Sequence, residues 1–361
     1  MTALDSRDRD VGAPPVRPPF FVELLRFVLV GIGYLSLLPA LAWYLAYIRL
    51  GDQIWWMFLV NSGATYLFAP VPIVLLAALL TRRWGLAVAA LVPLIVGAMV
   101  FGQLLVPRSL KVQQVDPSAP RLSVMTFNVH AHNDAPDALV ASILAAGADI
   151  VALQELSPSM TERVRNALRD EYPHFMIAAQ VDSSGNGILS RYPFEQLTRA
   201  QGWSDTRSPH GVMVHLPWGD LVLFNNHNTS TSRSLGDWPT EIAESMRQRE
   251  RVSESLVAFA AASPVPVIAV GDFNTTERSS AYDSMTQGFD DAWREAGFGF
   301  GHTFPGGPLA PTPFGFTPPP WLLRIDYVFF TRELTALDAR IGPWDGTSDH
   351  RPVVAVLAWP N

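Results

Sequence analysis

The chain of 361 residues contains no cysteine and only one lysine, Lys111. Without cysteine it can form no disulfide, bind no metal through thiolates and use no thiol nucleophile. Any metal must therefore be bound through oxygen atoms and imidazole rings. Charged residues are also scarce, at 16% of the chain, where about 25% is typical of soluble proteins.

The shortage of charge is concentrated in the N-terminal third. Up to Pro107 the chain has seven basic and five acidic residues. The region after Pro107 has 19 basic and 28 acidic residues, a net charge of −9, and it contains all eight histidines. Nucleic-acid binding depends largely on Lys and Arg side chains that neutralise phosphates. An acidic region with no basic run argues against a general nuclease.

Three long apolar runs fill the N-terminal third, at about residues 27–47, 54–80 and 85–106. Each is about long enough to cross a hydrocarbon core of roughly 30 Å. The second contains Asn61, Pro70 and Pro72 and is expected to be kinked. Three nearly uncharged runs in succession argue against buried core helices, and the first is longer than the roughly 7–15 apolar residues of a signal peptide.

Arginine placement predicts how these runs cross the membrane. Several arginines precede the first run, and Arg82 with Arg83 separates the second from the third. Positive residues favour the cytoplasmic side, so the N-terminus and this loop are expected inside and the C-terminal domain outside. We expect a cytoplasmic disordered tail at residues 1–23 and three transmembrane helices within residues 24–106. A linker at residues 107–120 then leads to a catalytic domain at residues 121–361.

After residue 120, short apolar runs typical of strands alternate with stretches of helical periodicity. Strands are predicted at residues 122–127, 150–153, 187–189, 212–216, 221–226, 267–270, 325–330 and 353–357, and helices at 137–146, 160–168 and 241–261. The mixture predicts an α/β domain.

Polar residues recur at the C-terminal ends of the predicted strands and in the loops that follow. They are Asn128, Glu155, His227, Asp272, Asn274, Asp326, Asp349 and His350. Reactive groups are commonly presented by loops on a rigid scaffold. A single polar residue at a strand end would be explained as a turn former. Six segments that each end in such residues are much harder to explain as turns.

These residue types suit hydrolysis of a phosphate ester. Glu155 is the first choice as ligand of a hard cation such as Mg²⁺, with Asn128 and Asp349 nearby. His350 can act as a base or as a charged donor to phosphate, and Asp326 can orient its ring.

Three further residues complete the predicted machinery. In an extended segment Asp272 and Asn274 point the same way, so Asp272 is expected to align the attacking water while the Asn274 amide binds a phosphate oxygen. His227 is expected to contact the phosphate or the leaving group.

The segments resemble the endonuclease/exonuclease/phosphatase superfamily. In family order they are Thr126-Phe127-Asn128, Leu153-Gln154-Glu155, Asn226-His227, Gly271-Asp272-Phe273-Asn274, Ile325-Asp326-Tyr327 and Ser348-Asp349-His350. The resemblance implies a four-layer α/β/β/α sandwich of two packed mixed sheets, dependence on Mg²⁺ or Mn²⁺, and the roles given above. Arg191, in a further matching segment, is implied as a substrate contact, with a structural role as the alternative.

A few N-terminal spans before an external domain of this superfamily are similar to bacterial vancomycin/teicoplanin-resistance membrane proteins. The resemblance implies a phosphorylated lipid or other phosphoester as substrate, at the outer face of a bacterial cell membrane. Nucleic acid is less expected, and no protein partner is predicted. The alternatives are an extracytoplasmic Mg²⁺-dependent nuclease and a non-enzymatic binding module; the presence of Glu155, Asp272 and His350 argues against the second.

Overall fold

The computed structural model describes residues 19–112, 115–197, 210–231, 237–307 and 319–359. A first mixed sheet contains β1 (Arg121–Asn128), β2 (Ile150–Gln154), β3 (His174–Ala178), β4 (Asn186–Ser190), β11 (Thr335–Ile341) and β12 (Val353–Ala358). Its strand order is β11-β12-β1-β2-β4-β3. Strands from both ends of the domain sequence therefore pair at its centre.

A second mixed sheet contains β5 (Phe194–Gln196), β6 (His210–Leu216), β7 (Gly219–His227), β8 (Val267–Asp272), β9 (Asp290–Asp291) and β10 (Asp326–Phe330). Its order is β5-β6-β7-β8-β10-β9. The two sheets pack face to face, with Val124 of β1 and Val270 of β8 in one buried core.

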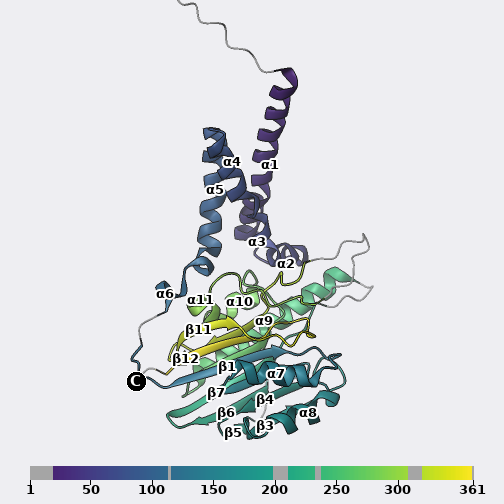
Figure 1. Ribbon diagram of the computed structural model, residues 1–361, viewed down its shortest axis with the longest axis vertical. Helices are drawn as coiled ribbons and strands as arrows, with labels where there is room; N and C mark the ends of the chain where they lie inside the picture. The colour runs from purple at the N-terminus through teal and green to yellow at the C-terminus, as the bar shows by residue number, and fades with distance from the viewer. Residues whose placement is uncertain (1–18, 113–114, 198–209, 232–236, 308–318, 360–361) are drawn as a thin grey trace, which may run out of the picture.

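Helices cover the outer face of each sheet (Figure 1). The helices α7 (Pro136–Ala146) and α8 (Pro158–Leu168) cover the first, while α9 (Trp238–Ala262) and α10 (Ser280–Met285) cover the second. Residues that alternate along a strand face opposite layers: Val124 faces the other sheet, whereas Met125 and Phe127 pack under the helices. The predicted four-layer α/β/β/α sandwich is confirmed.

Several short or peripheral elements lie outside the predicted ranges. They are β3, β5, β9, β11, α10 and α11 (Ala292–Ala296). The strands β3, β5, β9 and β11 form the two edges of each sheet. Edge strands need not be continuously apolar, and β11 (Thr-Ala-Leu-Asp-Ala-Arg-Ile) carries two charged residues that weaken its strand signal.

The N-terminal region is helical. It contains α1 (Phe20–Leu50), α2 (Trp55–Ser62), α3 (Ala64–Leu67), α4 (Pro70–Leu80), α5 (Trp84–Phe101), the 3-10 helix η1 (Gly102–Leu105) and α6 (Arg108–Lys111). Phe20–Leu50 and Trp84–Leu105 are long and apolar enough to cross a membrane. The second predicted span is kinked as expected, but its 66° bend lies between Trp55–Ser62 and Ala64–Leu80, at Gly63, and not at Pro70 or Pro72. Of the predicted tail, residues 1–18 lie outside the described residues.

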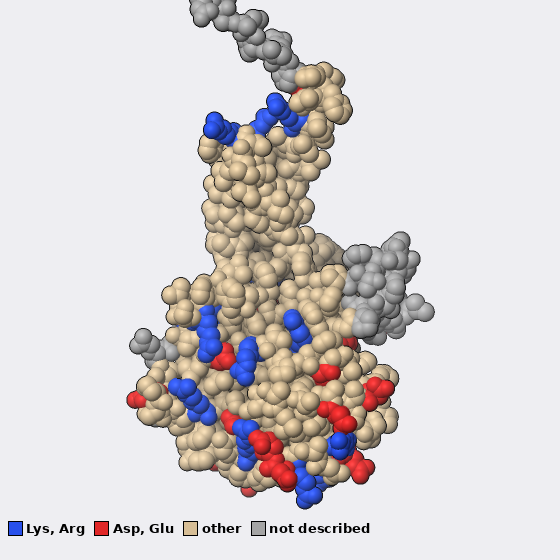
Figure 2. Space-filling model, in the orientation of Figure 1, with Lys and Arg blue, Asp and Glu red and all other residues tan. Residues whose placement is uncertain are grey.

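The helices α1, α4 and α5 form a stalk that stands on the sandwich domain, while α2 lies at its base (Figure 1). The stalk surface is apolar, and basic side chains mark its far end (Figure 2). Arg82 and Arg83 are exposed in the turn between α4 and α5. The predicted linker, residues 107–120, includes α6, where Lys111 donates to the carbonyl oxygens of Arg294 and Gly297.

Candidate active site

Strand register brings four of the predicted residues to one end of the sandwich. The strands β1 and β2 are parallel, so Asn128 ends its strand beside Gln154, directly before Glu155. The strands β7 and β8 are also parallel and end with His227 opposite Asp272. The C-terminal ends of both pairs lie together because the two sheets pack face to face: the Nδ2 of Asn128 is 3.1 Å from Asp272 Oδ2.

Antiparallel strands bring two more residues to the same end. The strand β10 begins there, with Asp326 opposite Asp272. His350 precedes β12, whose first residue, Val353, pairs with Thr126 near the end of β1. Sheet topology alone therefore gathers Asp326 and His350 with the residues of the parallel pairs.

The Oδ2 atom of Asp272 lies at the centre of the cluster. It is 3.7 Å from Nε2 of both His227 and His350, and it accepts hydrogen bonds from the amide groups of Asn128 and Asn274 at 3.1 and 3.0 Å. The Asp272 side chain is almost completely buried. Burial raises the pKa of Asp272 to about 7, with His350 opposing the shift and Asp326 adding to it.

Asp326 fixes the orientation of the His350 ring. The Nδ1 atom of His350 lies 2.9 Å from Asp326 Oδ2, which leaves Nε2 directed at Asp272. Burial alone would lower the pKa of His350, but the carboxylates of Asp326 and Asp272 outweigh it and raise the pKa to about 10. His350 is therefore an imidazolium at neutral pH, which favours the predicted role of charged donor over that of base.

Glu155 is partly accessible to solvent, with 16% of its side chain exposed, whereas the side chains of Asp272, His227 and His350 are at most 5% exposed. Its backbone φ of 58° is left-handed, which costs about 1–2 kcal/mol for a non-glycine residue. The carboxylate accepts hydrogen bonds from Asn128 Nδ2 and the Ala131 amide, and its Oε1 is 3.6 Å from His227 Nε2. The Oδ1 atom of Asn128 already accepts a hydrogen bond from the His130 backbone amide, and its Nδ2 donates to Glu155. This arrangement favours a role for Asn128 in positioning Glu155 over a role as a metal ligand.

The prediction of an extended segment at Asp272–Asn274 is wrong. The strand ends at Asp272, and Asn274 has a left-handed φ of 51°. The Asp272 side chain accepts from the Asn274 backbone amide at 2.8 Å, a local bond that closes a turn. Both hydrogens of Asn274 Nδ2 are directed at Asp272 Oδ2 and the Asn228 carbonyl, so Asn274 orients Asp272, and a phosphate contact would need one of these bonds to open.

Two predicted residues are not brought into contact with the cluster. Arg191 follows the far end of β4, and its guanidinium binds Asp149 and Glu171, which favours the structural alternative. Asp349 is half-buried, and no side-chain hydrogen bond is formed by it within the described part of the chain. Its negative charge contributes to the raised pKa of His350.

The structure adds two supporting residues to which the sequence analysis assigned no role, one inside a motif and one outside the motifs. Gln154 is buried between the sheets, where its amide donates to Asn225 Oδ1 at 2.7 Å and Thr126 Oγ1 at 3.0 Å. In the sequence, the feature that could have predicted this role is the polar side chain of Gln154 in the otherwise apolar run of β2. Arg249 on α9 donates to the carbonyl oxygen of Asn274 at 2.7 Å. Helical periodicity offered no signal for this contact.

The donor set fits a divalent cation beside Glu155. Asp272, Asp326 and His350 offer ligand atoms within 4.8 Å of one another, but the His350 charge lies between the two carboxylates. Among the described residues, His227 is the one basic side chain within ion-pair distance of Glu155, at 3.6 Å. Oxygen donors of this kind suit Mg²⁺ or Mn²⁺.

A sequence model of the endonuclease/exonuclease/phosphatase family matches residues 125–350, more than half of the chain. The chain belongs to this family. Its members are hydrolases that act on phosphoester bonds and generally use divalent metal ions. No curated protein sequence matches the chain.

Solved structures of other proteins are similar to this chain. A D. rerio TDP2 structure, complexed with a single-strand DNA product, is 18% identical with a TM-score of 0.50, covering 66% of this chain and 98% of that one. An endonuclease/exonuclease/phosphatase protein from Beutenbergia cavernae is 23% identical with a TM-score of 0.47, covering 67% and 72%. One from Bacteroides thetaiotaomicron is 16% identical with a TM-score of 0.46, covering 68% and 100%.

Proposed function

We propose that this family member hydrolyses a lipid-linked phosphoester or diphosphate with a divalent metal ion, at the outer face of a bacterial cell membrane. The observation that supports hydrolysis is the convergence of His227, His350 and Glu155 around Asp272. The layout, with N-terminal spans before the domain, is similar to vancomycin/teicoplanin-resistance membrane proteins and supports the lipid substrate.

The side chains can divide the chemistry of an in-line attack. Asp272, whose pKa is raised towards neutrality, orients the attacking water and takes its proton at Oδ2. His350 holds a proton at Nε2 and stabilises the charge on the phosphoryl oxygens, while Asp326 keeps its ring in place. His227, whose Nε2 lies 3.7 Å from Asp272 Oδ2, can donate to the leaving oxygen. A cation held by Glu155 would supply further stabilisation of the phosphate charge.

The position of the site relative to the stalk supports a lipid substrate. The Phe304 ring lies 4.8 Å from the His350 ring, and the Phe304 carbonyl accepts from the Leu322 amide. The Tyr66 hydroxyl of α3 donates to the Leu322 carbonyl at 2.7 Å. A chain of three contacts, from Tyr66 to Leu322, Phe304 and His350, thus links α3 to the site. A substrate whose phosphate lies at the membrane surface would meet the site there.

Surface charge gives less support to the nuclease alternative. Basic and acidic side chains are interspersed on the visible face of the domain (Figure 2). Exposed arginines form ion pairs with carboxylates, including Arg163 with Asp137, Arg247 and Arg251 with Glu244, and Arg340 with Asp338. Such paired arginines neutralise fewer nucleic-acid phosphates than free ones.

The test is a substrate panel with the full chain in lipid nanodiscs. Polyprenyl diphosphate, a sphingomyelin-like phosphodiester and plasmid DNA are each offered with Mg²⁺, and released phosphate, headgroup or nicked DNA is measured. We expect turnover of a lipid substrate that EDTA abolishes. Turnover of DNA alone would overturn the lipid proposal and favour the nuclease.

His350→Ala and His174→Ala provide the matched pair for this panel. His350 touches Asp272 and Asp326, whereas His174 lies on edge strand β3. We expect the first to abolish turnover and the second to retain it. Equal activity in both variants would remove His350 from the mechanism.

A further inference from the structure

The helix α2 leaves the stalk and packs on the sandwich domain. The 66° bend after Ser62 separates it from α4, and α2 lies against α9 at the base of the stalk (Figure 1). Met57 and Phe58 of α2 are buried there. This half-span therefore has a contact surface on the domain as well as a place beside the membrane.

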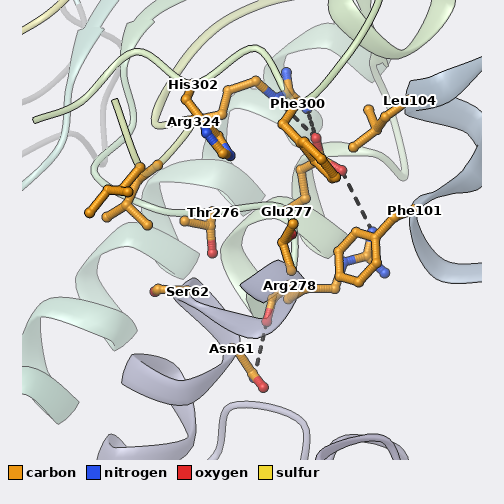
Figure 3. Close-up of a pocket in the computed structure, with 13 residues that line it drawn as sticks. Asn61, Ser62, Phe101, Leu104, Thr276, Glu277, Arg278, Phe300, His302 and Arg324 are labelled. Carbon is orange, nitrogen blue, oxygen red and sulfur yellow. Dashed lines mark hydrogen bonds and ion pairs between the residues drawn. The ribbon is translucent and has the colours of Figure 1, made fainter. Parts of the chain in front are cut away.

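Polar contacts fix both ends of α2 to the segment that follows the Asp272–Asn274 turn. Asp52, before the helix, accepts hydrogen bonds from the amide and hydroxyl of Ser280. Asn61, near its end, donates to the Arg278 carbonyl oxygen at 3.1 Å (Figure 3). The indole of Trp43 in α1 donates to Asn61 Oδ1 at 2.9 Å and holds the amide in this orientation.

Between these two ends, α2 reaches the turn itself through Arg249. The Phe58 ring covers the Arg249 guanidinium, whose central carbon is 4.6 Å from the ring centroid. Arg249 is 1% exposed and donates to the carbonyl oxygens of Asn274 at 2.7 Å and Thr229 at 3.3 Å. No carboxylate among the described residues lies within ion-pair distance of it.

A buried cation without a carboxylate partner depends on its remaining contacts. Here these are carbonyl oxygens, hydroxyl oxygens and the face of Phe58, which attracts a cation most strongly when water is excluded. Loss of the ring would admit water to the guanidinium and weaken its hold on Asn274. Asn274 in turn orients Asp272 through two hydrogen bonds.

We propose that α2 sets the catalytic geometry: Phe58 keeps Arg249 in place, and Arg249 acts as a positioning residue for the Asp272–Asn274 turn. The membrane anchor then controls the rate of hydrolysis as well as the location of the enzyme. The effect on rate rests on the proposed function, whereas the contact from Phe58 to Asn274 does not.

The kinetic test compares Phe58→Ala, Phe58→Leu and Arg249→Lys with Phe259→Ala, in the full chain in nanodiscs with Mg²⁺ and the soluble diester bis(p-nitrophenyl) phosphate. Phe259 is a matched control because it lies on α9, the helix that carries Arg249, but packs on Phe224. We expect kcat to fall about 10- to 100-fold in Phe58→Ala and Arg249→Lys with little change in KM. Phe58→Leu, which keeps volume without a ring face, is expected to lie between.

The second readout needs no activity. Hydrogen–deuterium exchange of the backbone amide of Asn274, which donates to Asp272 Oδ1, is followed in the same variants. We expect faster exchange in Phe58→Ala and Arg249→Lys and wild-type exchange in Phe259→Ala. Unchanged exchange in the first two overturns the proposal. Faster exchange in these two variants, together with a wild-type protein that hydrolyses none of the substrates offered, would retain the contact and reject the proposed function.

Discussion

At the scale of single residues, charge balance decides the role of each group in the cluster. His350 lies between the carboxylates of Asp272 and Asp326, so its positive charge is stabilised far above the usual pH range of an imidazole. Asp272, almost fully buried, is held closer to its neutral form than an exposed carboxylate would be. The pKa values of both groups are raised, so both hold a proton to higher pH than their exposed counterparts, and perturbed pKa values of this kind are typical of functional sites.

Asp326→Asn tests this balance. The pKa of His350 is raised by Asp326, so removal of that charge lowers it, and the imidazolium is lost at a lower pH. We expect the alkaline limb of the pH profile of kcat to move down by at least about one pH unit. Asp338→Asn, on edge strand β11, is the control and should leave the profile in place. Superimposable profiles for all three proteins would contradict the assignment of the charge to His350.

Arg191→Ala distinguishes a substrate contact from a structural role. Its guanidinium binds Asp149 and Glu171 at the end of β4 opposite Asn186, away from the cluster. We expect unchanged kcat and KM, with a stability loss of about 1 kcal/mol because the ion pairs are partly exposed. A clear rise in KM would restore the substrate contact that the family resemblance implies.

At the scale of elements, the strand ends were the part of the site that the sequence could predict. Apolar runs that end in a polar residue located Asn128, Glu155 and His227, and the sheets bring them together. The left-handed turn at Asn274 was not predictable from periodicity, because it depends on a hydrogen bond that the Asp272 side chain accepts from the Asn274 backbone amide. Arg249 has no signal either, since a buried arginine and an exposed one look alike in an amphipathic helix.

Gly271 shows why the Gly-Asp-Phe-Asn segment begins with glycine. Its φ is +141°, and an added Cβ would lie 1.8 Å from the Asn226 carbonyl oxygen of the neighbouring strand. We expect Gly271→Ala to force β7 and β8 apart and to destabilise the domain by about 2–4 kcal/mol. Gly102→Ala, with its nearest neighbour at 3.9 Å, is the control. The midpoint of thermal unfolding is measured for both variants. Equal midpoints would contradict this expectation and show that β7 and β8 accommodate the added methyl group.

At the scale of the whole molecule, the apolar stalk separates two ends of different charge. Arg82 and Arg83 mark one end, and the acidic sandwich domain forms the other. A pocket of about 40 Å³ at the junction has room for about one water molecule and is lined by polar residues, such as Asn61 and Glu277, and by apolar ones, such as Phe101 and Leu104 (Figure 3). It is too small for a lipid headgroup, so we expect the substrate to bind at the cluster.

The absence of cysteine allows the topology to be tested with single introduced thiols. We predict that Ser159→Cys, on α8, reacts with a membrane-impermeant maleimide in intact cells, and that Thr81→Cys, in the turn beside Arg82, reacts only after the membrane is opened. Labelling is read as a mass shift on gels. The reverse pattern would place the domain in the cytoplasm and remove the outer-face proposal.

A bound metal ion tests the central claim of convergence most directly. In crystals of the full chain soaked with Mn²⁺, we predict an anomalous-scattering peak roughly 2.0–2.6 Å from a Glu155 carboxylate oxygen, beside Asp272 and His227. The peak should disappear in Glu155→Gln. A catalytically active protein whose peak lies elsewhere, or persists in that variant, would contradict the account.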